Sequence, residues 1–499
     1  MSSDERKYDS QFDEYMDIPE EKFRLAYKDE KLGEKKLQTK PVGFFRDAMN
    51  RFARNRGSVI CGIIILVLAV YAVITPFVSP YSATAYDGYY SYALPKNSLF
   101  VKLGINFWDG TSKQSMNQQT YDYYAAIPGA ITEVIDVYEA TVDAGRKTTM
   151  YDVRLDSYAK VGYVTQLLTK AEYEAAKAWE EETGRTLFYP VIDESKIQNQ
   201  AYKNNANAWY LHNAKGVATR DADGNLQDIY KYDEDGNPQM YVSKMNGDQY
   251  QCRVLYSEWY YYQHGVYPSF LFGADNFGYD IFSRLALGAR LSLVLSVSVA
   301  SISLIIGIIV GALEGYYGGW FDLIFERVKD ILWEIPTVVF MSLFQIYLAN
   351  KVGPIVTLFF CFIFFDWIAT SSTVRAQFYR FKGQEYVLAA RTLGAKDRRI
   401  IFKHILPNAA GFIITTSVLT IPGVIFTEAN MTYLGIVNLQ SSSITSVGTM
   451  LNNAQSALST YPHAIFFPAA FIAILLICFN IFGNGLRDAF NPSLRGAEE

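Results

Sequence analysis

Six long apolar runs constrain this chain more than any other feature of its sequence. A helix of about 20 residues, rising about 1.5 Å per residue, crosses the hydrocarbon core of a bilayer, which is about 30 Å thick. Pro336 and Asp366 lie in the two shortest runs, and packing against neighbouring helices accommodates both residue types. We therefore predict an all-α polytopic membrane domain with six transmembrane helices. The runs are 58–78, 291–313, 331–348, 354–370, 409–427 and 464–483.

A large polar block separates the first apolar run from the second. The mean hydropathy of the whole chain is only +0.03, so a sizeable water-soluble part must dilute the apolar runs. The stretch 79–282 holds 26 of the 37 tyrosines and has 26 acidic against 17 basic residues. We predict an inserted α+β domain over 81–282.

Local signals within this block predict one helix. Thr169 and Glu172 have the spacing of a capping box, and Gly184 suits the end of the helix. Ala171, Ala175 and Trp179 fall on one face of such a helix.

Two similar segments, Asp221-Ala-Asp-Gly-Asn and Asp233-Glu-Asp-Gly-Asn, lie between tyrosine-bearing stretches. Asp-Gly and Gly-Asn sequences favour tight turns, so a small β-meander is predicted here. The alternative is a calcium loop of the EF-hand type, which needs Gly at position 6 and Glu at position 12. Here Gly stands at position 4 and Tyr232 at position 12, so the turn interpretation is preferred.

Positive charge sets the predicted orientation. Lys and Arg number 13 in 1–56, 8 in 371–408 and none in 428–463. Because basic loops stay on the cytoplasmic side, both termini are predicted to be cytoplasmic and the polar block extracytoplasmic. The predicted segments are a cytoplasmic leader 1–56, a first transmembrane helix 57–80, the extracytoplasmic domain 81–282, a five-helix core 283–486 that includes the cytoplasmic loop 384–408, and a cytoplasmic tail 487–499.

Several kinds of chemistry find no support in the sequence. The chain has no Gly-Lys dipeptide, so it cannot form the phosphate-binding loop of many ATPases. The histidines at 212, 264, 404 and 463 lack metal-ligand spacing, and a net charge of -5 argues against nucleic acid as a partner. No catalytic, cofactor-binding or metal-binding residue is predicted, and we do not expect an enzyme.

Cysteine usage bears on the setting. Cys252 is the one cysteine of the polar block, so that domain has no internal disulfide. Such usage is typical of proteins whose outer face lacks a thiol-oxidising compartment, as in many Gram-positive bacteria. We expect a bacterial, multi-pass cell-membrane protein.

The loop after the fourth run carries a motif. Residues 385–408 read EYVLAARTLGAKDRRIIFKHILPN, in which a short helix from Glu385, a break at Gly394 and a second helix leading into the fifth run are predicted. The alternative is a basic loop that rests on anionic lipid. The spacing of Ala389, Ala390, Gly394, Leu406 and Pro407 resembles the coupling loop, or EAA loop, of ABC-importer permeases. Leu388 stands where the general motif has glutamate.

The resemblance extends over 43–84 and 272–493, which are similar to the C-type permease subunit of oligopeptide and dipeptide ABC importers, a binding-protein-dependent transport inner-membrane component. The stretch 85–271 departs from that family as a large insertion. The matching residues include Pro80-Tyr81, Asp280, Gly315-Tyr-Tyr-Gly-Gly-Trp, Arg327, Asp330, Pro336, Trp367, Arg375, Glu428 and Gly485-Leu-Arg-Asp-Ala.

The resemblance implies a type I ABC importer permease fold and a division of labour among subunits. It implies a second permease, two ATPase subunits that hold ATP and magnesium, and a lipid-anchored solute-binding protein outside. It assigns Glu385, Ala389, Ala390 and Gly394 to contact with the ATPase, and Leu406 and Pro407 to the exit into the fifth helix. Peptide is the implied solute, with nickel or short saccharides as alternatives. A membrane sensor is the alternative from another class.

Three charged residues are candidates for the translocation path or a gate: Arg327, Asp330 and Glu428. Ionisable residues within membrane segments often have such roles. The alternative is that they form structural pairs or solvated helix ends.

Overall fold

The computed structural model describes residues 44–104, 107–142 and 146–490. The chain divides into Met1–Arg51 and Phe52–Glu499, and the first unit contributes only the beginning of helix α1 (Phe44–Arg54) to the described residues. Most of the predicted leader 1–56 and of the predicted tail 487–499 lies outside the described residues.

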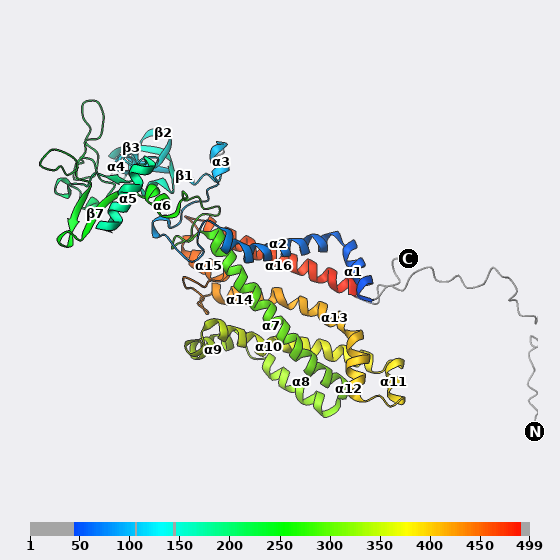
Figure 1. Ribbon diagram of the computed structural model, residues 1–499. Coiled ribbons are helices and arrows are strands. Elements are labelled where there is room, and N and C mark those ends of the chain that lie inside the picture. The colour runs from blue at the N-terminus through cyan, green and yellow to red at the C-terminus, as the bar shows by residue number, and fades with distance from the viewer. Residues whose placement is uncertain (1–43, 105–106, 143–145, 491–499) are drawn as a thin grey trace, which may run out of the picture. The chain divides into compact units, whose positions relative to one another are not determined.

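A helical bundle forms the membrane domain (Figure 1). In the described part of the chain, five helices are long and apolar enough to cross a membrane, or six if a bent pair is counted as one span. The predicted helical fold is therefore confirmed. The five are α2 (Arg56–Val78), α7 (Ile281–Tyr317), α10 (Pro354–Lys382), the broken helix Asp397–Tyr433 with α12 (Asp397–Arg399), α13 (Leu406–Val418) and α14 (Thr420–Tyr433), and α16 (His463–Phe490).

The third apolar run is not the continuous helix predicted over 331–348. It is divided between α8 (Gly319–Trp333) and α9 (Thr337–Val352), whose axes differ by 77°. Pro336 occupies the N-cap of α9 and has no backbone N–H to continue α8. The residue before a proline also avoids the helical conformation, so the chain turns at this point.

A glycine seam joins α7 to α10. Gly307, Gly311 and Gly315 recur every four residues on one face of α7. A Cβ added at Gly311 would lie 2.3 Å from the Ser371 carbonyl oxygen, and one added at Gly315 would lie 2.5 Å from Phe378 Cβ. Small residues at this spacing let two helices of a membrane bundle approach closely, and no larger residue would fit.

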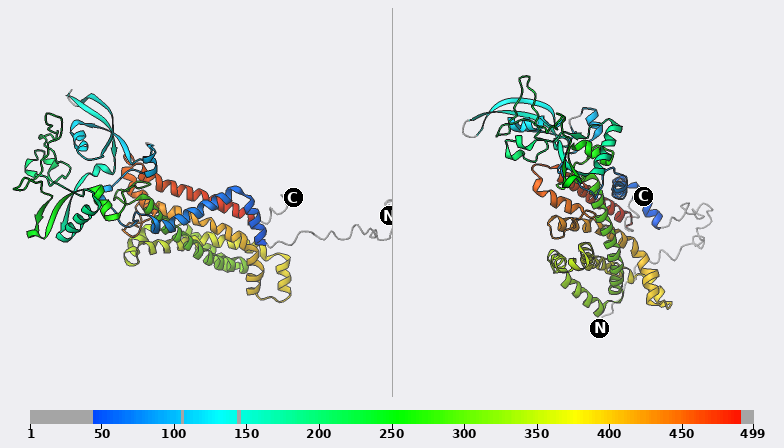
Figure 2. Two further views of the ribbon diagram at one scale, coloured as in Figure 1. Left: turned by 45° about the horizontal axis from the view of Figure 1, so that its top comes forward. Right: turned by 60° about the vertical axis from the view of Figure 1, so that its left-hand side comes forward.

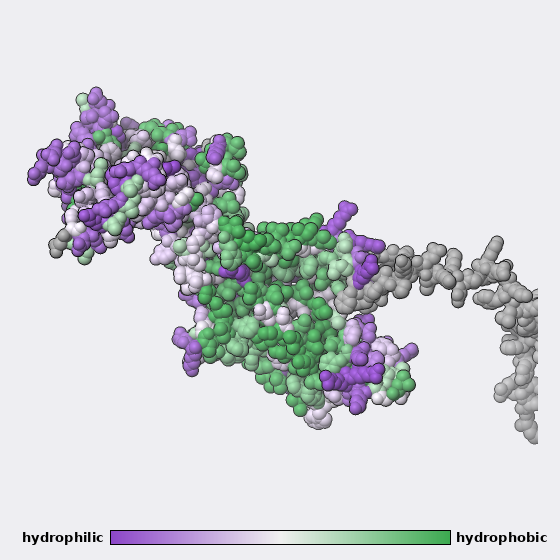
Figure 3. Space-filling model, in the orientation of Figure 1, coloured by the Kyte–Doolittle hydropathy of each residue, from purple (hydrophilic) through white to green (hydrophobic). Residues whose placement is uncertain are grey.

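The outward faces of the helices are apolar. On α2, the side chains of Leu66, Val73 and Phe77 are exposed, and Phe77 retains 77% of its accessible surface. Figure 3 shows this hydrophobic surface over the helices and a hydrophilic one over the inserted domain. A contiguous apolar face of this kind is stable against lipid and not against water.

The inserted domain contains two antiparallel sheets (Figures 1 and 2). The first has the strand order β1-β3-β2, and the second has β4-β7-β5 with β6 also paired to β7. The α+β prediction is correct in its elements. They are α3 (Ser98–Lys102), β1 (Thr111–Asn117), α4 (Gln118–Ala125), β2 (Ile131–Val142), β3 (Arg146–Asp156), β4 (Tyr163–Thr169), α5 (Lys170–Thr183), β5 (Phe188–Tyr189), β6 (Tyr241–Lys244), β7 (Gln249–Leu255) and α6 (Tyr256–His264).

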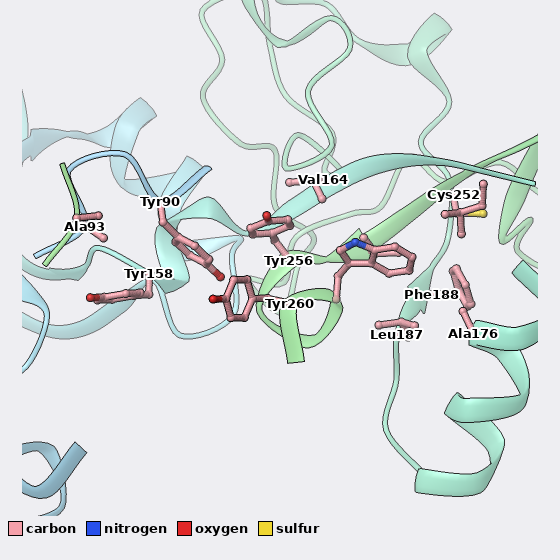
Figure 4. Packing of buried hydrophobic residues seen from close by; sticks show 14 of the residues in the cluster. Tyr90, Ala93, Tyr158, Val164, Ala176, Leu187, Phe188, Cys252, Tyr256 and Tyr260 are labelled. Carbon is pink, nitrogen blue, oxygen red and sulfur yellow. The ribbon is translucent and has the colours of Figure 1, made fainter. Parts of the chain in front are cut away.

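Aromatic side chains fill the core of this domain (Figure 4). Tyr90 is buried against the rings of Tyr158, Tyr256 and Tyr260 at centroid distances of 5.3 to 5.7 Å. Cys252 is buried in the same cluster as a free thiol, and burial raises its pKa to about 12. The domain is thus held by packed rings without an internal disulfide among its described residues.

The predicted β-meander is wrong in its strands and right in its turns. Residues 203–240 contain isolated bridges, such as Arg220 with Leu226 and Tyr232 with Pro238, in place of continuous strands. Each bridge closes a five-residue turn in which the Asp221 or Asp233 side chain accepts two backbone N–H groups. A third turn of the same kind begins at Asn213 and was not predicted.

Helix α5 begins and ends as predicted. Thr169 and Glu172 form both hydrogen bonds of the capping box, and Gly184 adopts the left-handed conformation at the C-cap. The predicted face is right at Trp179 and wrong at Ala171 and Ala175. Ala176 is buried, and Tyr173 and Trp179 are half-buried against the same core, while Ala171 and Ala175 are exposed.

Candidate functional site

A helical hairpin over 384–408 forms the first candidate site. It consists of α11 (Glu385–Thr392), a turn at Gly394 with φ of +81°, α12, and a π-helix over Ile400–Ile405 that leads into α13. The two predicted helices and the glycine break are present. Val387, Ile400 and Ile405 are fully buried against α7 and α10, so one apolar face fixes the hairpin on the bundle.

The opposite face of this hairpin is exposed and partly apolar. Leu393 keeps 87% of its surface, and Leu388 and Phe402 are also exposed. Apolar side chains at the tip of a polar, basic hairpin are typical of a surface that another protein covers. Of the predicted coupling residues, Glu385, Ala389, Gly394 and Pro407 are exposed, and Ala390 and Leu406 are half-buried.

The C-terminal end of α7 anchors the hairpin. The Tyr316 hydroxyl donates a hydrogen bond to Asp397 Oδ1 at 2.6 Å, and Arg391 Nη2 lies 3.4 Å from the same hydroxyl. Lys382 Nζ, at the end of α10, donates to the Gly315 carbonyl at 3.0 Å. These hydrogen bonds join the hairpin to α7 and α10, the two helices that share the glycine seam.

The three charged path candidates lie in two separate places. Arg327 and Asp330 form an exposed ion pair of 3.1 Å within α8. Glu428 on α14 is only 1% exposed, and Ser292 Oγ donates to its Oε2 at 2.7 Å. The structure does not bring Glu428 together with the Arg327–Asp330 pair.

A buried ionic network that the sequence analysis did not identify joins α7, α8 and α10. Lys329 Nζ lies 2.8 Å from Glu314 Oε2 and also pairs with Glu326, while Arg375 Nη2 donates to Asp322 Oδ2 at 2.8 Å. Asp322, Glu326 and Lys329 recur at a spacing of three to four residues, so they share one face of α8. This spacing in the sequence is the signal that could predict a charged face on this helix.

The base of the inserted domain is joined to the start of α7 by a buried arginine. Arg284 is 2% exposed, and its Nη1 donates to the carbonyls of Ala83 at 2.9 Å and of Ser442 at 2.8 Å. Stacked rings extend this junction, with Tyr92 against Tyr461 at 4.5 Å between centroids. The inserted domain is thereby fixed to the membrane helices by contacts far from the hairpin.

Comparisons with known proteins match the membrane helices. Residues 303–496 match the family of the binding-protein-dependent transport system inner membrane component, and 43–95 match the N-terminal transmembrane domain of oligopeptide transport permease C. The stretch between these two matches includes most of the inserted domain.

Curated relatives agree with these two matches. The oligopeptide transport system permease protein OppC of Bacillus subtilis is 44% identical over 224 residues, which are 45% of this chain and 72% of that protein. The dipeptide transport system permease protein DppC of the same organism is 38% identical over 45% of this chain and 69% of its own length. A solved chain of the inward-facing MetNI methionine ABC transporter aligns over 42% of this chain and 96% of its own length at 16% identity, with a TM-score of 0.34 that is too low to bear on function.

Proposed function

Since this chain belongs to the binding-protein-dependent transport permeases, in the group of the oligopeptide transport permease C, we propose that it forms one half of the membrane pathway of a peptide ABC importer. The single observation that carries the proposal is the 44% identity to the oligopeptide permease OppC over 224 residues, which are 72% of that protein. The exposed hairpin supports it independently, because it has the form of a docking element for a cytoplasmic subunit.

The proposed orientation follows from charge. The segment 371–408, with 8 Lys and Arg, is placed in the cytoplasm, and 428–463, with none, is placed outside. The inserted domain, joined to the start of α7, is then extracytoplasmic in a bacterial cell membrane, and both termini are cytoplasmic.

The proposed mechanism assigns the energy source to partner subunits. Two ATPase subunits hold ATP and magnesium, and their closure moves this hairpin and its counterpart on a second permease. Ala389, Ala390 and Gly394 contact the ATPase, because small residues allow its groove to approach the helix backbone. Leu406 and Pro407 pass the movement into α13, and Tyr316 passes it into α7. A lipid-anchored binding protein delivers the peptide from outside.

We propose two alternative roles for the inserted domain. It either docks the binding protein through its tyrosine-rich surface or acts as a spacer at the outer mouth. Replacement of 85–271 by a Gly-Ser link separates the two. If the domain docks the binding protein, the shortened transporter should no longer distinguish between loaded binding proteins. If the domain is a spacer, uptake by the shortened transporter should be unchanged.

Reconstitution tests the proposed function. The purified chain alone is expected to hydrolyse no ATP, whereas the chain with a second permease, two ATPase subunits and a binding protein is expected to accumulate labelled oligopeptide in an ATP-dependent manner. Uptake of nickel or a short saccharide in place of peptide would correct the solute. Hydrolysis by the chain alone would contradict the proposal.

A further inference from the structure

Asp366 is a carboxylate without a partner in the middle of α10. It lies in a largely apolar stretch of this helix, and no hydrogen bond or ion pair joins it to any of the residues that the structure describes. Its Oδ2 atom is inaccessible to solvent and has no hydrogen-bond partner. An unpaired charged group in the membrane interior is costly, and such residues generally face a cavity or a partner group.

A cavity of about 560 Å³ lies beside Asp366. It is bounded by α9, α10, α14 and the bend between α8 and α9, and its walls include Trp333, Phe365, Met341 and Thr427. Asp366 is the one charged residue among the described residues that line it. The volume is in the range of about 300 to 1,000 Å³ that is usual for small-molecule sites.

The walls of this cavity favour an organic cation over an anion or a neutral solute. A carboxylate attracts an ammonium or guanidinium group, and Trp333 and Phe365 supply aromatic rings to the lining, whose faces attract cations. The described lining of the cavity contains no Lys, Arg or His that could pair with the carboxylate. A cation that pairs with Asp366 must therefore belong to another molecule.

We propose that Asp366 is a specificity-determining residue that pairs with an ammonium or guanidinium group of the transported solute as it passes through this cavity. The inference rests on the proposed peptide import and concerns the Lys and Arg side chains of the peptide, not the N-terminal ammonium that every peptide carries. Asp366 does no bond chemistry. It lowers the energy of the cationic group within the membrane, where that group would otherwise be unpaired.

Uptake by the complete transporter tests this role with two matched tripeptides, Ala-Lys-Ala and Ala-Gln-Ala, and one binding protein. Discrimination by the binding protein is the same for every variant, so it cancels when variants are compared. Asp366→Asn is expected to lower the uptake of Ala-Lys-Ala at least tenfold relative to Ala-Gln-Ala, because the charge pair between Asp366 and the Lys side chain is lost. The loss should appear mainly as a higher KM for Ala-Lys-Ala. Asp366→Glu is expected to retain the preference.

The controls separate the inference from its premise. Asp488→Asn removes a carboxylate from the exposed end of α16 and is expected to leave the ratio unchanged. ATP hydrolysis stimulated by the loaded binding protein shows whether each variant is assembled. An equal loss for both peptides in an assembled Asp366→Asn transporter would overturn the inference and indicate a structural pair with the second permease. No loss for either peptide would overturn it as well, and would show that Asp366 has no role in uptake. Absence of any peptide uptake by the wild type would instead overturn the proposed function.

Discussion

The two ends of α7 carry regions that are stabilised in opposite ways. At one end, Arg284 satisfies buried carbonyls and stacked rings close the junction with the inserted domain. At the other end, about 48 Å away for the 32 residues from Arg284 to Tyr316, the hairpin buries one face and leaves Leu393 in solvent. The inserted domain buries its aromatic core within this chain, whereas the hairpin leaves an apolar surface exposed, which the proposed ATPase subunit would cover. The predictions below test this contrast.

Protease access gives the largest expected difference between the two regions, because it is all or none. In intact protoplasts, trypsin should cut after Lys215 and Arg220, which are exposed on the turns of the inserted domain. It should spare Lys396 and Arg398 in the hairpin until the membrane is lysed. Mass spectrometry of the fragments measures both. Cleavage in the hairpin before lysis would reverse the proposed orientation.

The second prediction concerns the exposed face of the hairpin. Leu393→Asp changes a side chain that is 87% exposed, so the stability of the isolated chain should change by no more than about 0.5 kcal/mol. In the complex the new charge would be buried without a partner, and uptake should fall at least tenfold together with ATPase association.

A matched leucine provides the control for this variant. Leu167 is also exposed, but it lies on β4 of the inserted domain. Leu167→Asp should leave co-purification of the ATPase unchanged. Full uptake by Leu393→Asp at normal expression would place the ATPase contact elsewhere.

Much of this contrast could be predicted from local sequence. The capping box at Thr169, the break at Gly394 and the apolar runs each depend on residues within one or two helical turns, and each is present in the structure. The bend at Pro336 is also a local feature, because proline has no N–H to continue a helix, although membrane helices tolerate proline where neighbouring groups replace the lost hydrogen bond.

Other features depend on how distant segments meet. The Lys329–Glu314 pair forms only because α7 and α8 pack at a particular rotation, which the sequence of either helix does not define. Asp366 Oδ2 likewise lacks a hydrogen-bond partner because the neighbouring helices place no donor beside it, which the sequence around Asp366 does not define. The turn at Asn213 lacks the Asp-Gly-Asn sequence of its two counterparts, although its Gly216 has the same left-handed conformation as Gly224 and Gly236.

The third prediction measures the junction at the other end of α7. Arg284→Met removes the guanidinium, so the carbonyl of the buried Ala83 and the carbonyl of Ser442 lose this donor. The free energy of unfolding should fall by about 3 kcal/mol, measured by thermal melting of the protein in detergent. Arg284→Lys keeps one donor group and should lose less. A melting temperature unchanged by Arg284→Met would show that the junction does not depend on this residue.

The smallest expected effect is a pH dependence at the same junction. Asp280 caps α7 with bonds to Ser283, and burial raises the pKa of its carboxyl to about 6. Its folded pKa is above the unfolded value of about 3.9, so the folded state binds more protons between these values and stability falls as pH rises through that window. Lowering the pH from 7 to 5 should therefore stabilise the junction by about 1 kcal/mol.

Asp193, whose pKa is lowered by the hydroxyl of Ser195, acts in the opposite direction only below this range. Melting at pH 7 and pH 5 measures the difference, and Asp280→Asn should reduce it while retaining an N-cap side chain. If Asp280→Asn left the melting difference between pH 7 and pH 5 unchanged, Asp280 would not be its source, contrary to the effect expected from its burial.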